Sequence, residues 1–414
     1  MTLGVGSWKL GVDDVTLVDV LIIGGGPGGL ATGRLLAAEG FEVVLFEEHA
    51  SSGEPVHCTG VLAAEAFDDP VIPGNVILNS LRTARFFAPC GASISHTTET
   101  TEAVVVDRAE LDRALFVAAR DAGVKVLTGR RATQVSIEND GVTVTLGDGA
   151  TFRGRACVLA CGANYSIQRK LGLGMPAVFL QSAQVEVPAA SPGDVEVRFG
   201  QDVAPGGFAW TVPVIRPSGP RARVGLMCDR DAARYFDRLL DRIAIAWGVS
   251  TIDEDGRRLV PRTKMLPLAP IDRTFTDRVL AVGDAAGLVK ATTGGGIFYS
   301  LLSAGFAADV LATALRADRL GASALKPYET AWKARLGPEL KAQLRLRRIS
   351  QRLSDDDVDA FFELARTDGV MPIVRRTARF NQHRDVILSL LRHPPARRIL
   401  LRRLLPRVTA GAVA

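Results

Sequence analysis

The stretch VDVLIIGGGPGGLATGRLLAAEGFEVVLFEE, residues 18–48, decides the fold of this chain. An apolar run leads into a cluster of glycines, a helix pattern of small residues follows, and a second apolar run ends in two acidic residues. Gly24, Gly26 and Gly29 have the spacing G-x-G-x-x-G. A strand, a glycine-rich turn, a helix and a second strand in this order are the signature of a dinucleotide-binding unit.

Each part of this unit has an expected role in holding a nucleotide. Gly24 allows the tight turn, Gly26 lets a pyrophosphate approach the backbone, and Gly29 lets helix and strand pack closely. The helix that begins near Gly28 offers free N–H groups and the positive end of its dipole to phosphates. Glu47, at the end of the second strand, is placed to accept hydrogen bonds from both ribose hydroxyls of an adenosine. The residues predicted to contact the nucleotide here are Gly24, Gly26, Pro27, Gly28, Gly29, Glu47 and Glu48.

Length and composition indicate a globular protein of two or three domains. The chain has 414 residues, of which 47% are hydrophobic and 23% charged. No uninterrupted apolar stretch approaches the length that crosses a bilayer, and residues 1–17 lack the features of a signal peptide and read as a disordered lead-in. The five cysteines are scattered and odd in number, which favours the reducing cytoplasm. Cys157 and Cys161 lie in an apolar run without a nearby histidine, so we predict no metal site.

Arginines concentrate in the last third of a chain whose net charge is +5. The run RHPPARRILLRRLLPR, residues 392–407, alternates arginines with leucines and contains no aromatic residue. Without aromatics it offers no platform for stacking bases, so we predict no nucleic-acid partner. An anionic lipid surface fits better, which would place the protein peripherally at the inner face of the cell membrane. A solvated helix face explains the run equally well.

Two later segments favour FAD as the nucleotide. Asp284 follows the apolar run of VLAVGDAAG, where an aspartate can bond a ribityl hydroxyl of a flavin. The turn TTGGG, residues 292–296, aims the start of a helix at the same place, where it would stabilise the negative charge of a reduced flavin. A threonine-capped helix is the alternative, but three successive glycines are unusual for capping alone. The predicted contacts are Gly283, Asp284, Thr293, Gly294, Gly295, Gly296 and Ile297.

Arg108 is a further candidate for contact with the flavin chain or phosphates. It precedes an amphipathic helix in the segment VDRAELDRAL, residues 106–115. A surface ion pair is the alternative explanation for this arginine.

The order of these patterns predicts an α/β protein (α+β overall). Turn signals at residues 139–141 and 147–149 indicate a β-meander within a Rossmann-like domain. Short alternating strands over residues 175–265 indicate a mainly antiparallel sheet. We assign residues 18–62, 101–174 and 266–326 to an FAD-binding domain, 63–100 and 175–265 to a substrate domain, and 327–414 to a C-terminal helical region.

Taken together, these segments resemble a known family. The order GGGPGG, VDRAELDRAL, ACGANYSIQRKLG and VLAVGDAAG resembles flavoproteins of the para-hydroxybenzoate hydroxylase type and, within them, the geranylgeranyl reductase family. The resemblance covers residues 18 to about 400. Cys161 and Gly162 stand where the hydroxylase branch has Asp-Gly, so the resemblance does not imply an NADPH contact of the hydroxylase kind.

Three stretches carry the narrower resemblance. GEPVHCTG resembles the family's cysteine loop, which implies that Cys58 lies near the flavin. There its thiol is a catalytic candidate that could position the substrate or relay a proton, and a small buried hydrophobe is the alternative role. His57 beside it is an acid–base candidate. KATTGGGI resembles the glycine-rich helix start over the flavin ring. GFAWTVPVIRPSGPRARVGLM resembles the aromatic-x-Trp-x-x-Pro … Val-Gly motif that lines the family's lipid pocket. The substrate contacts that it implies are Phe208, Trp210, Pro213 and Gly225.

The resulting expectation is an FAD-dependent reductase that saturates carbon–carbon double bonds of a polyprenyl chain, carried by an isoprenoid lipid or a prenyl diphosphate. The flavin gives a hydride while the protein holds the chain and excludes water. No second strand-linked G-x-G-x-x-G is present, so NAD(P)H or a ferredoxin-like protein would supply electrons. The alternatives are a flavin monooxygenase or halogenase, because FAWTVP also resembles the halogenase Trp-x-Trp-x-Ile-Pro motif, and a non-enzymatic flavoprotein of the membrane surface. The sequence gives no oligomeric state.

Overall fold

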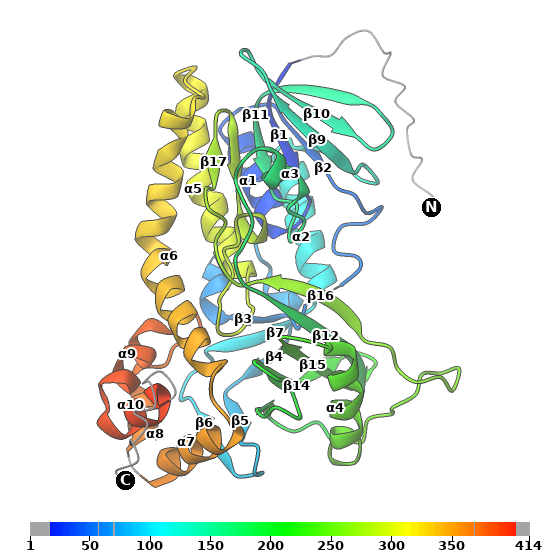
Figure 1. The fold of residues 1–414 in the computed structure, drawn as a ribbon. Helices are drawn as coiled ribbons and strands as arrows, with labels where there is room; N and C mark the ends of the chain where they lie inside the picture. Colours follow the sequence, from blue (N-terminus) through cyan, green and yellow to red (C-terminus); the bar gives the residue numbers. More distant parts are fainter. Residues whose placement is uncertain (1–16, 57, 69–70, 368, 403–414) are drawn as a thin grey trace, which may run out of the picture.

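The computed structural model describes residues 17–402 except residues 57, 69–70 and 368 (Figure 1). The acid–base candidate His57, the lead-in over residues 1–16 and the basic end beyond residue 402 therefore lie outside the described residues. Two large sheets, a small sheet between them and a C-terminal group of helices make up the molecule, which confirms the predicted α/β class.

The first large sheet has eight strands, with β1 (Val18–Ile23) at its centre. β11 (Thr151–Leu159) and β2 (Val43–Phe46) pair with β1 in parallel on its two sides. β18 (Val279–Ala281) and β8 (Lys125–Leu127) extend the sheet in parallel on either side. β1, β2 and β18 are almost wholly buried apolar runs, as expected for parallel strands covered on both faces.

Antiparallel strands complete this sheet. β17 (Phe275–Thr276) pairs with β18 at one edge, and β9 (Ala132–Ile137) and β10 (Val142–Leu146) continue antiparallel from β11. The last two strands are the β-meander that the turn signals predict. Among the described residues, the remaining short elements are α3 (Ser166–Lys170) and three 3₁₀ helices, Ala64–Asp68, Gly74–Val76 and Gly283–Ala286.

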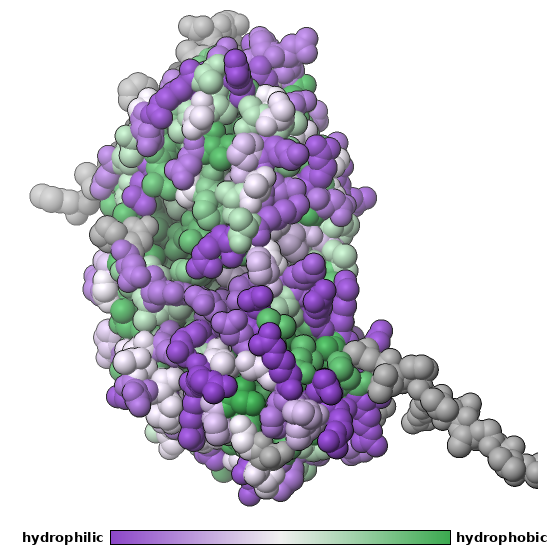
Figure 2. Space-filling model, turned by 90° about the vertical axis from the view of Figure 1, so that its left-hand side faces the viewer, coloured by the Kyte–Doolittle hydropathy of each residue, from purple (hydrophilic) through white to green (hydrophobic). Residues whose placement is uncertain are grey.

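Long helices pack beside this sheet. α1 (Pro27–Ala38) packs against α2 (Arg108–Asp121) and α5 (Ile297–Arg316), and α5 packs against α6 (Ala322–Ser350). Within the described residues, α5 is the one helix long and apolar enough to cross a membrane, although Asp309 interrupts its apolar run. Half of the most apolar 18-residue segment of α5 is buried inside the protein, as in a core helix. The molecular face that carries α5 and α6 is hollowed in its upper half, and hydrophobic residues gather in the hollow (Figure 2).

The second large sheet has seven strands and is mainly antiparallel. In sheet order they are β16 (Arg262–Pro267), β12 (Phe179–Pro188), β15 (Gly219–Cys228), β14 (Phe208–Arg216), β13 (Val195–Arg198), β5 (Thr83–Phe87) and β6 (Ser93–Thr97). α4 (Ala232–Trp247) covers one face, where its Phe236 and Ile243 pack in one cluster with Val224 and Leu226. The other face turns toward the rest of the molecule (Figure 1).

A small three-stranded sheet lies between the two large ones (Figure 1). It consists of β3 (Val61–Ala63), β7 (Ala103–Val106) and β4 (Ile77–Leu81), and Val105 of β7 packs against β14. β7 falls in the predicted FAD-binding domain and β4 in the predicted substrate domain. The antiparallel pairing of these two strands joins the predicted domains, which the local sequence did not indicate.

The C-terminal region is helical, and it begins earlier than predicted. α6 starts at Ala322 rather than at Pro327, because the carboxylate Oδ1 of Asp277 accepts a hydrogen bond of 2.6 Å from the Ala322 N–H and holds its first turn. The helices that follow are α7 (Asp355–Thr367), α8 (Val370–Thr377), α9 (Arg384–Arg392) and α10 (Pro394–Leu401).

Candidate cofactor and substrate site

A cavity of about 580 Å³ opens at the carboxyl ends of β1 and β11. Ile23 and Phe46 mark the ends of β1 and β2 in its wall, and Ala160 marks the end of β11. Ligands of open parallel sheets bind at this edge, outside the carboxyl ends of the strands. We refer to it as the cofactor cavity.

Of the three glycines of the G-x-G-x-x-G turn, only the second, Gly26, borders open space in which a ligand can approach the backbone. A Cβ atom on Gly24, whose φ is +109°, would lie 2.3 Å from the carbonyl oxygen of Ala160, and one on Gly29 would lie 2.0 Å from that of Gly24. Around Gly26 a Cβ atom would meet nothing within 4 Å. The first and third glycines therefore allow close packing of the backbone, whereas the second keeps open the space in front of α1. No side chain caps α1, and Gly26 is its N-cap.

Glu47 is fixed at the rim of the turn. Its Oε2 accepts a 2.7 Å hydrogen bond from the Gly25 N–H, and its Oε1 accepts one of 2.8 Å from the His49 N–H. The carboxylate lines the cofactor cavity, where it has further lone pairs for a ribose. Glu48 lines it too but is half exposed and lies 3.6 Å from Arg131.

At the other end of the cavity the two predicted flavin segments lie side by side. Gly283 and Asp284 line the cavity, and a Cβ atom on Gly296 would lie 2.5 Å from Oδ1 of Asp284. Gly294 and Ile297 also line it, whereas Thr293 and Gly295 are not among its lining residues. α5 begins at Ile297 with Gly296 as its N-cap and no side-chain cap, so the threonine-capped alternative does not describe this helix start.

Residues of the C-terminal helical region form hydrogen bonds with the glycine loop, which we define as residues 290–296. Arg347 of α6 is buried, and its Nε donates a 2.6 Å hydrogen bond to the carbonyl of Ala291. Lys290 is buried as well, and its Nζ donates to the carbonyl of Phe380 at 3.1 Å. Burial lowers the pKa of Arg347 to about 10 and that of Lys290 to about 8.

His383 completes this support. Burial, aided by the charge of Lys290, lowers the pKa of His383 to about 4, so its imidazole is neutral. Its Nε2 lies 3.0 Å from the carbonyl of Phe380, which can only accept, so Nε2 carries the proton. Nδ1 therefore accepts the 2.6 Å hydrogen bond from the hydroxyl of Thr292.

Arg108 lines the cavity from the start of α2. It is 9% exposed, and its Nη2 donates to both carboxylate oxygens of Asp112, at 2.7 and 2.6 Å. Burial by itself lowers the pKa of Arg108, but the charge of Asp112, its hydrogen bond and the charge of Asp284 more than offset this effect, and the pKa is raised. The arginine is ion-paired, as the alternative proposed, but the pair is buried and faces the cavity.

Cys58 lines the cavity and is partly exposed to it. Its Sγ accepts a 3.3 Å hydrogen bond from the Gly60 N–H. The side chain therefore differs from the fully buried cysteines 157 and 228, which line no part of this cavity. Its position fits the cysteine loop that the resemblance implies better than the buried alternative.

Successive side chains of β14 point to opposite faces of the sheet, so the predicted substrate contacts do not all lie on one face. Phe208 and Trp210 lie opposite Met227 and Gly225 of β15, on the face turned away from α4. A Cβ atom on Gly225 would lie 2.6 Å from the Trp210 ring, so this glycine makes room for the indole. Pro213 is an odd number of residues from both aromatics and therefore points to the opposite face, toward α4. The structure does not bring it together with the other three.

Phe208 and Trp210 adjoin the glycine loop through Ala291, and none of Phe208, Trp210 and Gly225 lines the cofactor cavity itself. Phe208 and Trp210, with ring centres 5.8 Å apart, belong to an apolar cluster with Met227. A Cβ atom on Gly294 would lie 3.5 Å from the Met227 sulfur and 3.0 Å from Leu266. The aromatic face of the seven-stranded sheet thus reaches the loop that edges the cavity.

The cavity also has lining residues that were not predicted from the sequence. They include His49, Arg130, Arg131, Cys161, Lys264 and Leu266. The two arginines follow β8, which ends at the same sheet edge as β1, so the order of strands was a usable signal for them. Burial raises the pKa of the Cys161 thiol to about 11, so this thiol is protonated.

Comparisons with known proteins agree with this geometry. The family described as FAD binding domain matches residues 17–177. A digeranylgeranylglycerophospholipid reductase of Methanocaldococcus jannaschii is 30% identical over 83% of this chain and 90% of its own length. One of Methanothermobacter thermautotrophicus is 31% identical over 83% and 90%. A solved geranylgeranyl bacteriochlorophyll reductase-like protein of Thermoplasma acidophilum, 22% identical, covers 94% of this chain and 99% of its own with a TM-score of 0.77, which shows the fold.

The matching domain identifies the ligand of the cavity as FAD, and the residues fit this group. The open space at Gly26, the uncapped start of α1 and the Glu47 carboxylate suit a pyrophosphate and a ribose. Asp284 and the start of α5 suit the flavin end.

Proposed function

Because the chain belongs to the geranylgeranyl reductase family of FAD-dependent oxidoreductases, we propose that it saturates carbon–carbon double bonds of a polyprenyl chain in an isoprenoid lipid. The observation that carries the proposal is the contact between the aromatic face of the seven-stranded sheet and the glycine loop. Phe208 and Trp210 form one apolar cluster with Met227 and Leu266, and these last two side chains lie against Gly294, which lines the cofactor cavity. An unsaturated hydrocarbon held there would lie at the edge of the cofactor site.

Reduction of an isolated alkene needs a hydride on one carbon and a proton on the other. FAD, when bound and reduced, supplies the hydride. The partly exposed apolar side chains of Phe208 and Trp210 orient the chain and exclude water. In this proposal the Cys58 thiol, which faces the cavity, holds the proton for the second carbon. Loss of activity in Cys58→Ala with normal FAD content would support that role, and full activity would exclude it.

Anaerobic reoxidation of the reduced flavoprotein tests the function directly. The purified holoenzyme is reduced with dithionite and mixed with digeranylgeranyl phospholipid, with geranylgeranyl diphosphate, or with the fully saturated lipid as the matched control. We expect reoxidation and a product heavier by two hydrogens per bond with an unsaturated substrate only. No alkene-dependent reoxidation with any prenyl substrate would refute the proposal. Product formation that requires oxygen would favour the monooxygenase or halogenase alternative.

The electron donor is part of the same proposal. NADPH, NADH and reduced ferredoxin are compared as reductants of the oxidised holoenzyme under anaerobic conditions. We expect one of them to bleach the flavin at a rate that supports turnover. Because dithionite replaces the donor in the previous experiment, failure of all three leaves the test of the reductase itself intact.

We also propose that the protein is cytoplasmic and that its C-terminal helices bring it to the inner face of the cell membrane. The support is a set of exposed arginines on and beside α8 to α10, namely Arg375, Arg376, Arg379, Arg397 and Arg398. Cations of this kind are attracted to anionic lipid by about 1 kcal/mol each near the surface. Co-sedimentation with anionic vesicles should be lost in Arg397→Glu/Arg398→Glu and kept in Arg234→Glu/Arg242→Glu, a matched reversal on α4. Equal vesicle binding by both variants would exclude these helices as the membrane-binding surface.

A further inference from the structure

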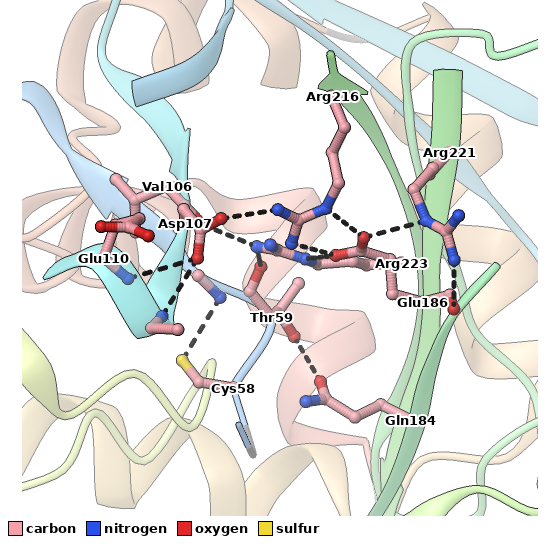
Figure 3. A network of polar contacts seen from close by, with 12 residues as sticks. Cys58, Thr59, Val106, Asp107, Glu110, Gln184, Glu186, Arg216, Arg221 and Arg223 are labelled. Atoms are coloured by element: carbon pink, nitrogen blue, oxygen red, sulfur yellow. Dashed lines mark hydrogen bonds and ion pairs between the residues drawn. The ribbon is translucent and has the colours of Figure 1, made fainter. Parts of the chain in front are cut away.

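Arg223 of β15 is a buried cation that reaches from the seven-stranded sheet to the segment carrying Cys58 (Figure 3). It is 4% exposed. Its Nη1 donates hydrogen bonds to two carbonyls, that of Thr59 at 2.6 Å and that of Val106 at 2.9 Å. Its Nε donates to Oε2 of Glu186 at 2.8 Å. One guanidinium thus ties the residue after Cys58 and the end of β7 to β12.

Glu186 is the anchor of this contact. It accepts hydrogen bonds from Arg216 at 2.5 and 3.0 Å, and the Nε of Arg221 lies 3.0 Å from its Oε1 (Figure 3). Burial by itself raises the pKa of Glu186, but the surrounding arginines lower it below its usual value. Arg216 also donates at 2.6 Å to Asp107, the N-cap of α2. The network therefore fixes Arg223 in one orientation and extends to the helix that carries Arg108 into the cavity.

The segment of residues 58–60 is shaped around this guanidinium. The Thr59 hydroxyl donates to Oε1 of Gln184 at 3.0 Å, so Thr59 is held on two sides by the same sheet. Gly60 has a φ of +68°, and a Cβ atom on it would lie 2.4 Å from Nη1 of Arg223. Any side chain at position 60 would displace the arginine. Cys58, bonded through its Sγ to the Gly60 N–H, follows the position of this segment.

Such a network is poorly explained by stability alone. A buried ion pair often contributes little net stability, because desolvation of both charges offsets their attraction. It does fix geometry, since each group has a defined partner and direction. Here the fixed geometry joins the sheet that carries Phe208 and Trp210 to the residue that lines the cofactor cavity.

We propose that Arg223, held by Glu186, is a positioning residue that sets the place of the Cys58 thiol in the cofactor cavity relative to the substrate-binding sheet. The effect on turnover rests on the proposed function. The effect on the thiol does not, because it concerns only the geometry of residues 58–60.

Alkylation of Cys58 by iodoacetamide in the FAD-loaded enzyme tests the position of the thiol. Peptide mass spectrometry follows Cys58, with the exposed Cys90 as an internal reference. In Arg223→Gln we expect the Cys58 rate to rise about tenfold relative to Cys90, because the segment opens locally. Arg221→Gln is the matched control, since Arg221 contacts Glu186 but, among the described residues, no part of the Cys58 segment. Its Cys58 rate should stay within about twofold of the wild type.

Arg223→Lys keeps the pairing with Glu186 and covers the case in which the glutamine variant does not fold. A lysine has no fork to hold both carbonyls, so we expect an intermediate Cys58 rate. Kinetics with a prenyl substrate should show kcat lowered by about 100-fold in Arg223→Gln, with KM much less changed, because a displacement of about 1 Å has this effect on a reacting group. An unchanged Cys58 rate in both Arg223 variants, or an equal rise in Arg221→Gln, would overturn the proposal. A changed Cys58 rate in an enzyme that reduces no alkene would uphold the positioning role and refute only the proposed function.

Discussion

Two alanine substitutions in the glycine turn are expected to separate folding from cofactor binding. In Gly29→Ala the new Cβ would lie 2.0 Å from the carbonyl oxygen of Gly24, and real Cβ atoms essentially never come closer than 3.0 Å to a non-bonded heavy atom of this kind. α1 and the turn must therefore separate by at least about 1 Å, and overpacking of this kind costs about 1–3 kcal/mol. We expect a loss of about 3 kcal/mol in the free energy of unfolding, because both partners are backbone.

Gly26→Ala is expected to behave in the opposite way. Its Cβ would meet nothing within 4 Å, and its φ of −79° suits any residue. The folded protein should lose only about 1 kcal/mol for a poorer N-cap. The methyl group, however, fills the space through which a pyrophosphate reaches the start of α1. Loss of one such charge-assisted hydrogen bond, about 1.5–3 kcal/mol, weakens FAD binding by about 10- to 100-fold.

Both quantities are measured on the apoprotein. Urea unfolding gives stability, and titration with FAD, followed by quenching of flavin fluorescence, gives affinity. Gly305→Ala in α5 is the control, since its Cβ would also meet nothing within 4 Å, and both values should match or slightly exceed the wild type. Wild-type affinity in Gly26→Ala, or an equal loss of stability in the two turn variants, would refute this account of the cavity.

Three further predictions concern the aromatic face and the glycine loop. Phe208→Ala should raise the KM for a prenyl lipid about tenfold through lost apolar contact, whereas Pro213→Ala, on the opposite face, should leave KM unchanged; equal effects in steady-state kinetics would contradict this. Because burial lowers the pKa of His383 from 6.5 to about 4, its contribution to stability is present above pH 6.5 and is lost as the pH falls toward 4, by up to about 3 kcal/mol. His383→Gln should flatten this part of the pH profile of stability in urea unfolding, and an unchanged slope would exclude this contribution of His383. Arg347→Met strands two carbonyls, those of Ala291 and Gly206, and should lower stability by about 2–4 kcal/mol in thermal unfolding; a loss below about 1 kcal/mol would contradict the role of this arginine.

The parts of the fold predicted correctly are those whose signals are local. The turn at Gly24 and the acid at Glu47 lie within one strand–helix–strand unit, so spacing alone specifies their relation. Asp284 was found because an aspartate after a buried strand is itself a local signal. The family resemblance added Cys58, which spacing alone would have left as a buried thiol.

The missed parts depend on contacts between distant segments. Lys290 and Thr292 meet Asn381 and His383 across 91 residues, and no pattern near either segment indicates that pairing. Pro213 is different, because the information was available. A strand has a period of two, and Pro213 follows Trp210 by three residues, so the alternation already opposed the common pocket that the motif implied.

The support of the glycine loop by Arg347 and His383 has a consequence for how the protein is made. The residues that line the cofactor cavity all fall between Ile23 and Ser300, and the flavin end of the cavity is supported by Arg347 and His383, which follow them in the chain. A chain emerging from the ribosome N-terminus first can therefore form β1, α1 and β2 early but cannot complete the site until these later residues have been synthesised. FAD should accordingly be captured only after His383 has emerged, and ribosome-bound chains that stop before α6 should retain no flavin.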